Sequence, residues 1–306
     1  MKWKLTLSRI TPDQSQQLAS TRTEHQETGH PKMIDLKTII FTLTMMLPAI
    51  ASAYDYTLER TESGAEYGYH QGTGGGPLLV IITTDIKESM TNTYSPVGAL
   101  LSAKGYSVAA IDVPCHGKDT NKKEGSGLEC WRVRADNTSD NIFDSYISSL
   151  KSVLSDVADK HNARLGDVTV LGISRGGYIA MKAAAEIPSI TTVIAMAPVT
   201  DVFRLREFDG SKANKSVYTL VPYYPALSKK HVFIQINNDD DRVGTTETIY
   251  LISGITEAGS PDAVDLTAIL TPKKGHSTSE HEMAAAWALA QQQKATTTGK
   301  QMSAPK

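Results

Sequence analysis

The sequence lacks several features that would mark other classes of protein. Only two of its 306 residues are cysteine, and their spacing fits neither a metal cluster nor a CxxC redox pair. No apolar run in the chain reaches the about 20 residues that a comfortable membrane-spanning helix needs. The formal net charge is −2, so there is no basic excess for binding nucleic acid or an anionic membrane surface. The remaining composition, 40% hydrophobic and 21% charged, is that of a globular chain with a sizeable core.

A segment near the N-terminus has the pattern of a secretory signal peptide. Lys37 precedes a short apolar run that ends at Leu47, and Ala-Ser-Ala at 51–53 offers a cleavage-type site. We therefore expect an upstream extension over residues 1–32, a signal peptide over 33–53, and a secreted or periplasmic mature chain without stable membrane insertion. The alternative is an uncleaved membrane anchor or a buried N-terminal helix.

Both cysteines, Cys115 and Cys130, fall in the predicted mature part. Export to an oxidising compartment permits a disulfide between them. Closing a loop of about 15 residues is worth roughly 3 kcal/mol in the chain-entropy model. Two free thiols, with Cys115 buried, are the alternative that the sequence leaves open.

From residue 78 onward, short apolar runs alternate with helix-compatible stretches. Parallel strands buried on both faces have this pattern, because their crossover helices cover both sides of the sheet. The sequence thus predicts an α/β fold, a three-layer sandwich with a mostly parallel sheet, preceded by one or two irregular strands within 54–69. The expected strands are 78–83, 106–111, 168–173, 192–197, 231–236 and 264–270, and the expected helices are 96–104, 141–161, 175–186, 245–258 and 280–292.

These elements are expected to form one domain over residues 54–294. The stretch 200–230 is the long connection on the C-terminal side, and about 30 residues suffice for a small flap but not for a large cap domain. Three tyrosines in this stretch are candidates to line a substrate pocket, the alternative being aromatic packing under the loop. They are Tyr218, Tyr223 and Tyr224. Residues 295–306 are polar and small, which predicts a disordered tail.

The strand-like run 168–173 leads into Gly172-Ile-Ser-Arg-Gly176, which has the pattern of a nucleophile elbow. In such an elbow a serine occupies a strained strand-to-helix turn, so the residues two before and two after it must be small. The turn exposes the hydroxyl of Ser174 and places the first amides of the following helix beside it. The strand before and the helix-compatible stretch after it make Ser174 a candidate nucleophile rather than an ordinary serine in a glycine-rich turn.

A serine hydroxyl needs a histidine to accept its proton and a carboxylate to orient that histidine. His276 is the candidate histidine, because it follows the last predicted strand and precedes the final helix. The strand 231–236 runs into three adjacent aspartates, and catalytic carboxylates emerge at strand ends in such sheets. We expect Asp240 to be the acid, with Asp241 and then Asp239 as alternatives. An acidic calcium loop is a further alternative, although the run lacks the glycine and glutamate of an EF-hand.

An oxyanion hole for acyl transfer needs two backbone amides. One is expected from Arg175, next to the serine, and the other from the turn after the 78–83 strand, at Thr84 or Asp85. The carboxylate of Asp85 would disfavour a developing negative charge there unless its side chain turns away or is held by a local hydrogen bond.

Together the motifs resemble those of the α/β-hydrolases, and more narrowly of the prolyl oligopeptidase-like and dienelactone hydrolase-like serine esterases. The residues that carry this resemblance are 111–117 (IDVPCHG), 172–177 (GISRGG), 197–201 (APVTD) with 205–208 (LREF), 237–244 (NNDDDRVG) and 275–277 (GHS). The resemblance implies an α/β-hydrolase fold with Ser174, Asp240 and His276 as the catalytic triad. It also suggests Arg242 as a substrate contact, the alternative being an exposed arginine in a salt bridge. One departure is the turn 83–87, where most relatives carry His-Gly and a small residue.

These expectations predict a secreted serine esterase that cleaves carboxylic esters through an acyl-enzyme and needs neither a metal nor another cofactor. Its expected partner is a small-molecule ester, and no nucleic-acid partner is expected. One alternative is a serine peptidase of prolyl oligopeptidase type that acts on small peptides. Another is a binding protein that keeps the fold without catalysis, motivated by the altered turn at 83–85.

Overall fold

The computed structural model describes residues 54–73, 76–91, 94–260 and 263–302 of the chain. The upstream extension and the signal peptide that the sequence predicts lie outside these residues. Within them, none of the helices combines the length and the apolar character needed to cross a membrane.

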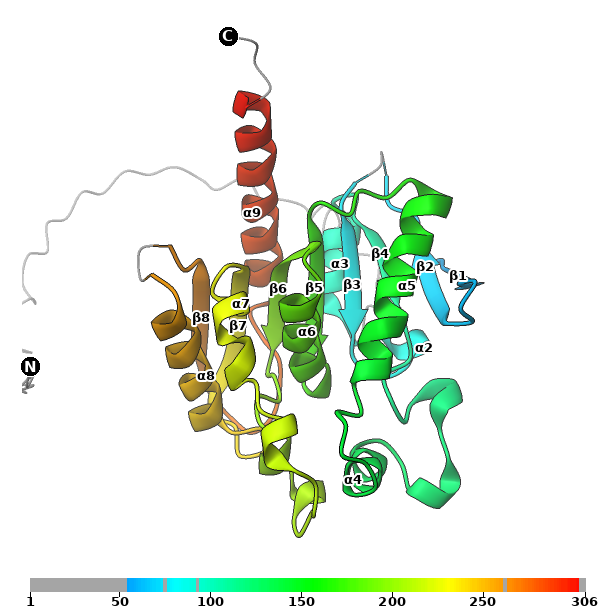
Figure 1. Cartoon of the computed structure of the whole chain (residues 1–306). Helices are drawn as coiled ribbons and strands as arrows, with labels where there is room; N and C mark the ends of the chain where they lie inside the picture. Colours follow the sequence, from blue (N-terminus) through cyan, green and yellow to red (C-terminus); the bar gives the residue numbers. More distant parts are fainter. Residues whose placement is uncertain (1–53, 74–75, 92–93, 261–262, 303–306) are drawn as a thin grey trace, which may run out of the picture. The chain divides into compact units, whose positions relative to one another are not determined.

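One eight-stranded sheet organises the described part of the chain (Figure 1). In chain order its strands are β1 (Thr57–Arg60), β2 (Glu66–His70), β3 (Leu78–Ile82), β4 (Ser107–Ala110), β5 (Val168–Ile173), β6 (Ile190–Met196), β7 (His231–Asp239) and β8 (Leu266–Lys274). Their spatial order is β1-β2-β4-β3-β5-β6-β7-β8. All neighbours from β4 to β8 are parallel, whereas β2 pairs antiparallel with both β1 and β4.

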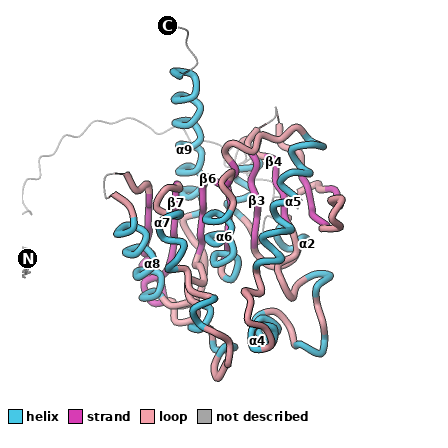
Figure 2. The backbone as a smooth tube through the Cα atoms, in the orientation of Figure 1, coloured by secondary structure: helices cyan, strands magenta, loops and turns pink. Residues whose placement is uncertain are grey.

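Helices cover both faces of this sheet, because each connection between parallel strands must cross over it (Figures 1 and 2). The α-helices are α2 (Ile86–Ser89), α3 (Pro96–Ser102), α4 (Leu128–Asp136), α5 (Asp144–His161), α6 (Arg175–Glu186), α7 (Tyr224–Leu227), α8 (Thr245–Ala258) and α9 (His281–Met302). The predicted three-layer α/β sandwich with a mostly parallel sheet is therefore confirmed.

The core explains why the strand sequences are apolar at successive positions. In β3, Leu78, Val80 and Ile82 belong to a hydrophobic cluster that includes residues of α5, α6 and α8, whereas Leu79 and Ile81 belong to a second cluster with α3 and α9. Successive side chains of a strand point to opposite faces. A strand covered on both faces must therefore be apolar at each of these positions.

Helix α4 is the longest of the α-helices that the sequence analysis missed, the others being the four-residue α2 and α7. It begins after Gly127 without a side-chain cap, and four of its nine residues are charged (Glu129, Arg132, Arg134 and Asp136). The first feature removes the start signal, and the second weakens the apolar pattern on which helix prediction relies. Its position depends instead on tertiary contacts, since the Trp131 ring packs edge-on against Phe143 at 4.6 Å between centroids.

At the C-terminus the structure differs from the predicted disordered tail. Helix α9 continues to Met302, beyond the expected boundary at residue 295. Its first turns are anchored in the core by the buried Ala284, Ala285 and Ala288. Extending an existing helix adds one hydrogen bond per residue without a new nucleation cost, so a polar composition alone does not end it.

The connection between β6 and β7 contains short helices and no cap domain over residues 197–230, all of which the structure describes. Besides α7 it holds the 3-10 helices η3 (Val202–Arg204), η4 (Arg206–Phe208), η5 (Lys215–Val217) and η6 (Val221–Tyr223). Two more, η1 (Gly117–Asp119) and η2 (Lys122–Glu124), lie between β4 and α4.

Cys115 and Cys130 form a disulfide bond, which decides between the two alternatives that the sequence left open. Their Cα atoms are 6.0 Å apart, and the bond joins the loop after β4 to α4. The buried indole of Trp131 adds a second tie, because its Nε1 donates a hydrogen bond to the carbonyl of Pro114 at 2.6 Å. The loop and the helix therefore form one cross-linked unit.

Replacing both cysteines by alanine should lower the free energy of unfolding by about 3 kcal/mol, because the unfolded chain loses the closure of a 15-residue loop. Denaturant titration of the wild type and of the Cys115→Ala/Cys130→Ala variant measures the difference. A thiol reductant should destabilise the wild type and leave the variant unchanged. Equal stability of the two oxidised proteins would contradict this account.

Candidate active site

Ser174 occupies the turn between β5 and α6 in a backbone conformation that few residues adopt. Its φ of 53° and ψ of −116° lie outside the regions that non-glycine residues favour. Three backbone hydrogen bonds hold it: its N–H donates to Met196 at 3.0 Å, and its carbonyl accepts from Gly177 at 2.9 Å and Val199 at 2.8 Å. The serine is thereby fixed at the carboxyl end of β5, as the elbow pattern predicts.

Close contact between main chains explains the glycines on either side of this serine. A Cβ atom on Gly176 would lie 1.8 Å from the carbonyl oxygen of Ile82, at the end of β3. A Cβ atom on Gly172 would lie 2.5 Å from the carbonyl oxygen of Gly176. Both distances are far below van der Waals contact, so any side chain at either position would push β3, β5 and α6 apart.

The structure brings Ser174, His276 and Asp240 into one hydrogen-bonded line. Nε2 of His276 lies 2.8 Å from Oγ of Ser174, and Nδ1 of the same ring lies 2.8 Å from Oδ2 of Asp240. With a proton on Nδ1, the ring donates to the carboxylate and its Nε2 accepts from the serine hydroxyl. Three residues spread over a hundred positions of the sequence thus meet through their side chains.

Of the three adjacent aspartates, Asp240 is the one that contacts His276. Its side chain is fully buried, and its Oδ1 accepts hydrogen bonds from the amides of Arg242 at 3.1 Å and Val243 at 3.2 Å. Asp239 is 63% exposed and faces Lys274 at 3.6 Å, and Asp241 is exposed. The two amides hold the Asp240 carboxylate with its other oxygen directed at the imidazole.

The loop that carries His276 is tied to the end of β7. Nδ2 of Asn237 donates to the carbonyl of Gly275 at 2.7 Å and to Oγ of Ser277 at 2.9 Å. The amide of Gly275 donates to the carbonyl of Asp239 at 2.7 Å, and Gly275 has a φ of 79°, in the left-handed region that favours glycine. The imidazole is therefore positioned from the residues on both sides of it.

The residues predicted for the oxyanion hole lie beside the elbow. Arg175 is the first residue of α6, where helix geometry gives its amide no intrahelical acceptor. The turn with Thr84 and Asp85 directly follows β3, whose end contacts Gly176. Oδ1 of Asp85 accepts from the amide of Glu88 at 2.8 Å and caps α2. The Asp85 carboxylate is thus held by the local hydrogen bond that an oxyanion site at this turn requires.

A cavity of about 350 Å³ opens beside Ser174 and His276. Arg242 lines it and also forms the salt bridge that the sequence analysis gave as the alternative, since its Nη2 donates to Oε1 of Glu207 at 2.8 Å. The other lining residues are Tyr94, Leu128, Ile173, Arg175, Leu205, Ser277 and Thr278. The cavity therefore combines an apolar wall with two guanidinium groups.

Two of the predicted substrate tyrosines lie elsewhere, which corrects the sequence analysis. Tyr218 is buried and donates to the carbonyl of Asp140 at 3.2 Å. The hydroxyl of Tyr223 donates to Glu186 at 3.0 Å and accepts from Lys182 at 2.7 Å. Both side chains instead pack under the connection between β6 and β7, which is the alternative that the sequence analysis gave for these tyrosines.

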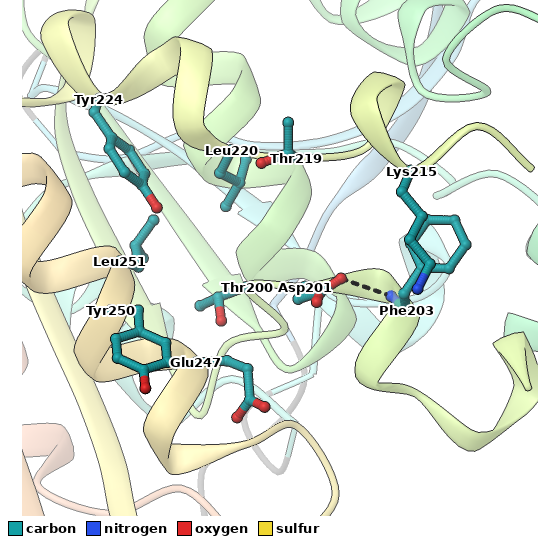
Figure 3. A pocket seen from close by; sticks show the side chains of 10 residues that line it. All are labelled: Thr200, Asp201, Phe203, Lys215, Thr219, Leu220, Tyr224, Glu247, Tyr250 and Leu251. Carbon is teal, nitrogen blue, oxygen red and sulfur yellow. Dashed lines mark hydrogen bonds between the residues drawn. The ribbon is translucent and has the colours of Figure 1, made fainter.

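Tyr224 also lies outside the cavity beside Ser174. It lines a second cavity of about 310 Å³ together with Tyr250 and Leu251 of α8 and Thr200 of the connection after β6 (Figure 3). Its ring packs on Gly254, where an added Cβ atom would lie 2.0 Å from Cε2 of the tyrosine. The tyrosine is held by α8, and no sequence pattern indicates this contact between two helices.

The apolar wall of the cavity was missed at the sequence level. Tyr94 and Leu128 lie in or beside elements with no catalytic motif, and Leu205 belongs to a motif, LREF, that indicates the family but no role for the leucine. Their common property is spatial, since each comes from a segment that follows the carboxyl end of a different strand. Such residues are found by following strand ends to the switch points of the sheet.

Fold and site together define a serine hydrolase of the α/β-hydrolase fold. Residues 80–248 match the family model described as serine aminopeptidase, S33, and the chain belongs to this family. No curated protein matches the sequence.

Solved structures with the same fold include enzymes of two kinds. The esterase Pf2001 of Pyrococcus furiosus superimposes with a TM-score of 0.54 at 17% identity, over 78% of this chain and 90% of that chain. TT1662 from Thermus thermophilus gives 0.58 at 16% identity, over 77% and 97%. The acylaminoacyl peptidase of Pyrococcus horikoshii gives 0.56 at 14% identity, over 83% and 42%. At these identities the likeness concerns the fold.

Gly176→Ala should both destabilise the protein and disable Ser174, because the new methyl group must displace the end of β3 from α6. We expect a loss of about 1–3 kcal/mol in the free energy of unfolding, the usual range for an overpacked site. Gly166→Ala is the matched control, since an added Cβ there meets no atom within 4 Å. Denaturant unfolding and labelling of Ser174 by a fluorophosphonate measure the two effects. A Gly176→Ala protein that equals the control in both would contradict the close-contact argument.

Proposed function

We propose that the chain is a carboxylic ester hydrolase that works through an acyl-enzyme. The observation that carries the proposal is the hydrogen-bonded line from Asp240 through His276 to Ser174, with 2.8 Å at each step. A serine nucleophile, a histidine base and an orienting carboxylate in this order are what acyl transfer from an ester requires.

In the first half-reaction, Oγ of Ser174 attacks the ester carbonyl carbon while Nε2 of His276 takes the hydroxyl proton. Asp240 stabilises the imidazolium that forms, because its buried carboxylate lies against Nδ1. When the carbon–oxygen bond to the alcohol breaks, His276 returns the proton to the departing oxygen. The acyl group then remains as an ester on Ser174.

In the second half-reaction, a water molecule attacks the acyl-enzyme and gives its proton to Nε2 of His276. The bond to Oγ of Ser174 breaks, the proton returns to the serine, and the carboxylic acid leaves. Both tetrahedral intermediates place negative charge on the former carbonyl oxygen. We assign its stabilisation to the amide of Arg175 and to one amide of the turn at Thr84 and Asp85.

Esters are favoured over peptides because an alcohol is expelled more readily than an amine. The cavity, with no cap domain over the described residues 197–230, suits the easier of the two reactions. A small-peptide peptidase is the second candidate, because the family description and the acylaminoacyl peptidase with the same fold both name peptide-cleaving enzymes.

We also propose that the protein is exported. The signal-peptide pattern over residues 33–53 is one argument, and the Cys115–Cys130 disulfide is another. Stable structural disulfides form in oxidising compartments such as the periplasm or the exterior. Expression of the full chain tests this part of the proposal: the protein should be recovered from the periplasm or the medium with an N-terminus near Tyr54.

A fluorophosphonate probe should label the wild type at Ser174 and fail to label Ser174→Ala. In the absence of the probe, the wild type should hydrolyse short p-nitrophenyl esters faster than proline-containing peptide amides, since p-nitrophenolate leaves more readily than an amine. Peptide mapping of the adduct and steady-state rates on both substrate classes measure these outcomes. Faster amide cleavage would reverse the ranking, and an unlabelled wild type would favour a binding protein without catalysis.

Asp240→Asn should lower kcat by about 10³–10⁴-fold. The neutral amide of asparagine cannot stabilise the imidazolium as the carboxylate does, and it does not hold the neutral His276 ring in the required tautomer. Asp241→Asn is the matched control: this neighbour is exposed and contacts neither Ser174 nor His276. Its kcat should stay close to that of the wild type. Similar losses in both variants would place the acid elsewhere.

A further inference from the structure

The side chain of Arg175 belongs to the cavity beside the serine and has a role separate from that of its amide. Its guanidinium Nη1 donates to Nε2 of His116 at 2.7 Å. It interacts electrostatically with Tyr94 and Arg242, and both of these line the same cavity. The cationic head therefore faces the space in which a substrate of Ser174 would bind.

The two arginines of the cavity differ in how their charge is balanced. Arg242 pairs with the carboxylate of Glu207 at 2.8 Å. In the part of the chain that the structure describes, Arg175 forms no ion pair, and its single side-chain hydrogen bond goes to a histidine. Glu207 and Glu88 act on it at longer range, and Glu88 is exposed to solvent. One guanidinium is thus neutralised locally and the other is not.

His116 holds Arg175 without neutralising it. Its Nδ1 donates to the carbonyl of Pro114 at 2.9 Å, which leaves Nε2 as the acceptor for the guanidinium. Burial lowers the pKa of His116, and the charge of Arg175 lowers it further, despite the bond to Pro114. The ring is therefore neutral near pH 7 and orients the cation while leaving its charge intact.

A hydrogen bond and a disulfide hold the segment next to His116. Pro114 also accepts the indole hydrogen bond of Trp131 at 2.6 Å, and the neighbouring Cys115 is cross-linked to α4. Burial lowers the pKa of the Arg175 guanidinium, yet arginine stays charged at neutral pH. Partial burial of a cation without a counterion costs free energy, and an anionic ligand that pairs with the cation would offset this cost.

We propose that Arg175 binds a carboxylate of the substrate, so that the preferred substrate is an ester carrying a negative charge near its scissile bond. This inference rests on the proposed function and names its substrate class. A planar guanidinium matches a carboxylate through two parallel N–H···O bonds. The carboxylate that Arg175 recognises belongs to either the acyl or the alcohol portion of the ester. The two pairs of esters in the following test distinguish these possibilities.

The test compares two matched pairs of esters, with hydrolysis followed by proton release. Monomethyl glutarate and methyl pentanoate differ by an acyl-side carboxylate, and 3-acetoxypropanoate and propyl acetate differ by an alcohol-side one. The wild type should favour the anionic member of one pair by about tenfold to a hundredfold in kcat/KM, the range for a charge-assisted hydrogen bond. The neutral members report the proposed esterase activity on their own.

Arg175→Gln should remove the preference for the anionic ester, and Arg175→Lys should restore part of it, because lysine keeps the charge but not the fork. Arg164→Gln is the matched control, since Arg164 is exposed and precedes the amino end of β5, at the sheet edge opposite Ser174. Its preference should equal that of the wild type.

A further measurement needs only the wild type, in case Arg175→Gln does not fold. Raising the salt concentration should increase KM for the anionic ester and leave the neutral ester unaffected. Cleavage of neutral esters with no anionic preference, or a preference that survives Arg175→Gln, would overturn the carboxylate site alone. Absence of both hydrolysis and Ser174 labelling would instead overturn the proposed function.

Discussion

The Ser174 backbone keeps its strained conformation because the main chain around it leaves no other. Such a residue costs on the order of 1–3 kcal/mol, and here three backbone hydrogen bonds and the contact of β3 with Gly176 offset the cost. The rest of the site follows from this packing. The same contact that forbids a side chain at Gly176 brings the end of β3, and with it the turn at Thr84 and Asp85, to the first turn of α6. The packing that strains Ser174 is therefore the same packing that brings the end of β3 to the start of α6.

Charges at the site are distributed so that each buried group has a defined partner. The Asp240 carboxylate is fully buried, but two amides and the imidazole of His276 satisfy it. Because an isolated buried carboxylate is very unfavourable, these hydrogen bonds offset the cost of its burial and direct it at the histidine. Arg242 is likewise paired, with Glu207. Arg175 departs from this pattern, and departures from local rules concentrate where a protein acts on something else.

The sequence predicted those parts of the molecule that local patterns determine. The strand β5 and the helices α6 and α8 have the predicted bounds, because apolar runs and glycine or proline signals mark them. Ser174 and His276 were likewise predicted from local signals, Ser174 from the elbow pattern around it and His276 from its position between the last predicted strand and the final helix. The cavity wall and the true position of Tyr224 were not found, because they depend on which helix packs on which strand. A contact such as that of Tyr224 with Gly254 joins residues that have no shared period or motif.

The disulfide connects the chemistry of the proposed compartment with the organisation of the cavity. Its two ends bracket a segment that contains His116, which binds the Arg175 guanidinium, and Leu128, which lines the cavity. An added Cβ on Gly127, one residue before Leu128, would lie 3.0 Å from Nη1 of Arg175, so the start of α4 forms part of the guanidinium's enclosure. A cross-link that constrains both walls of this enclosure reduces the number of positions that Arg175 samples before a ligand binds. Since affinity is lost to whatever must be ordered on binding, the disulfide would favour the proposed recognition of an anionic group by holding Arg175 in place beforehand.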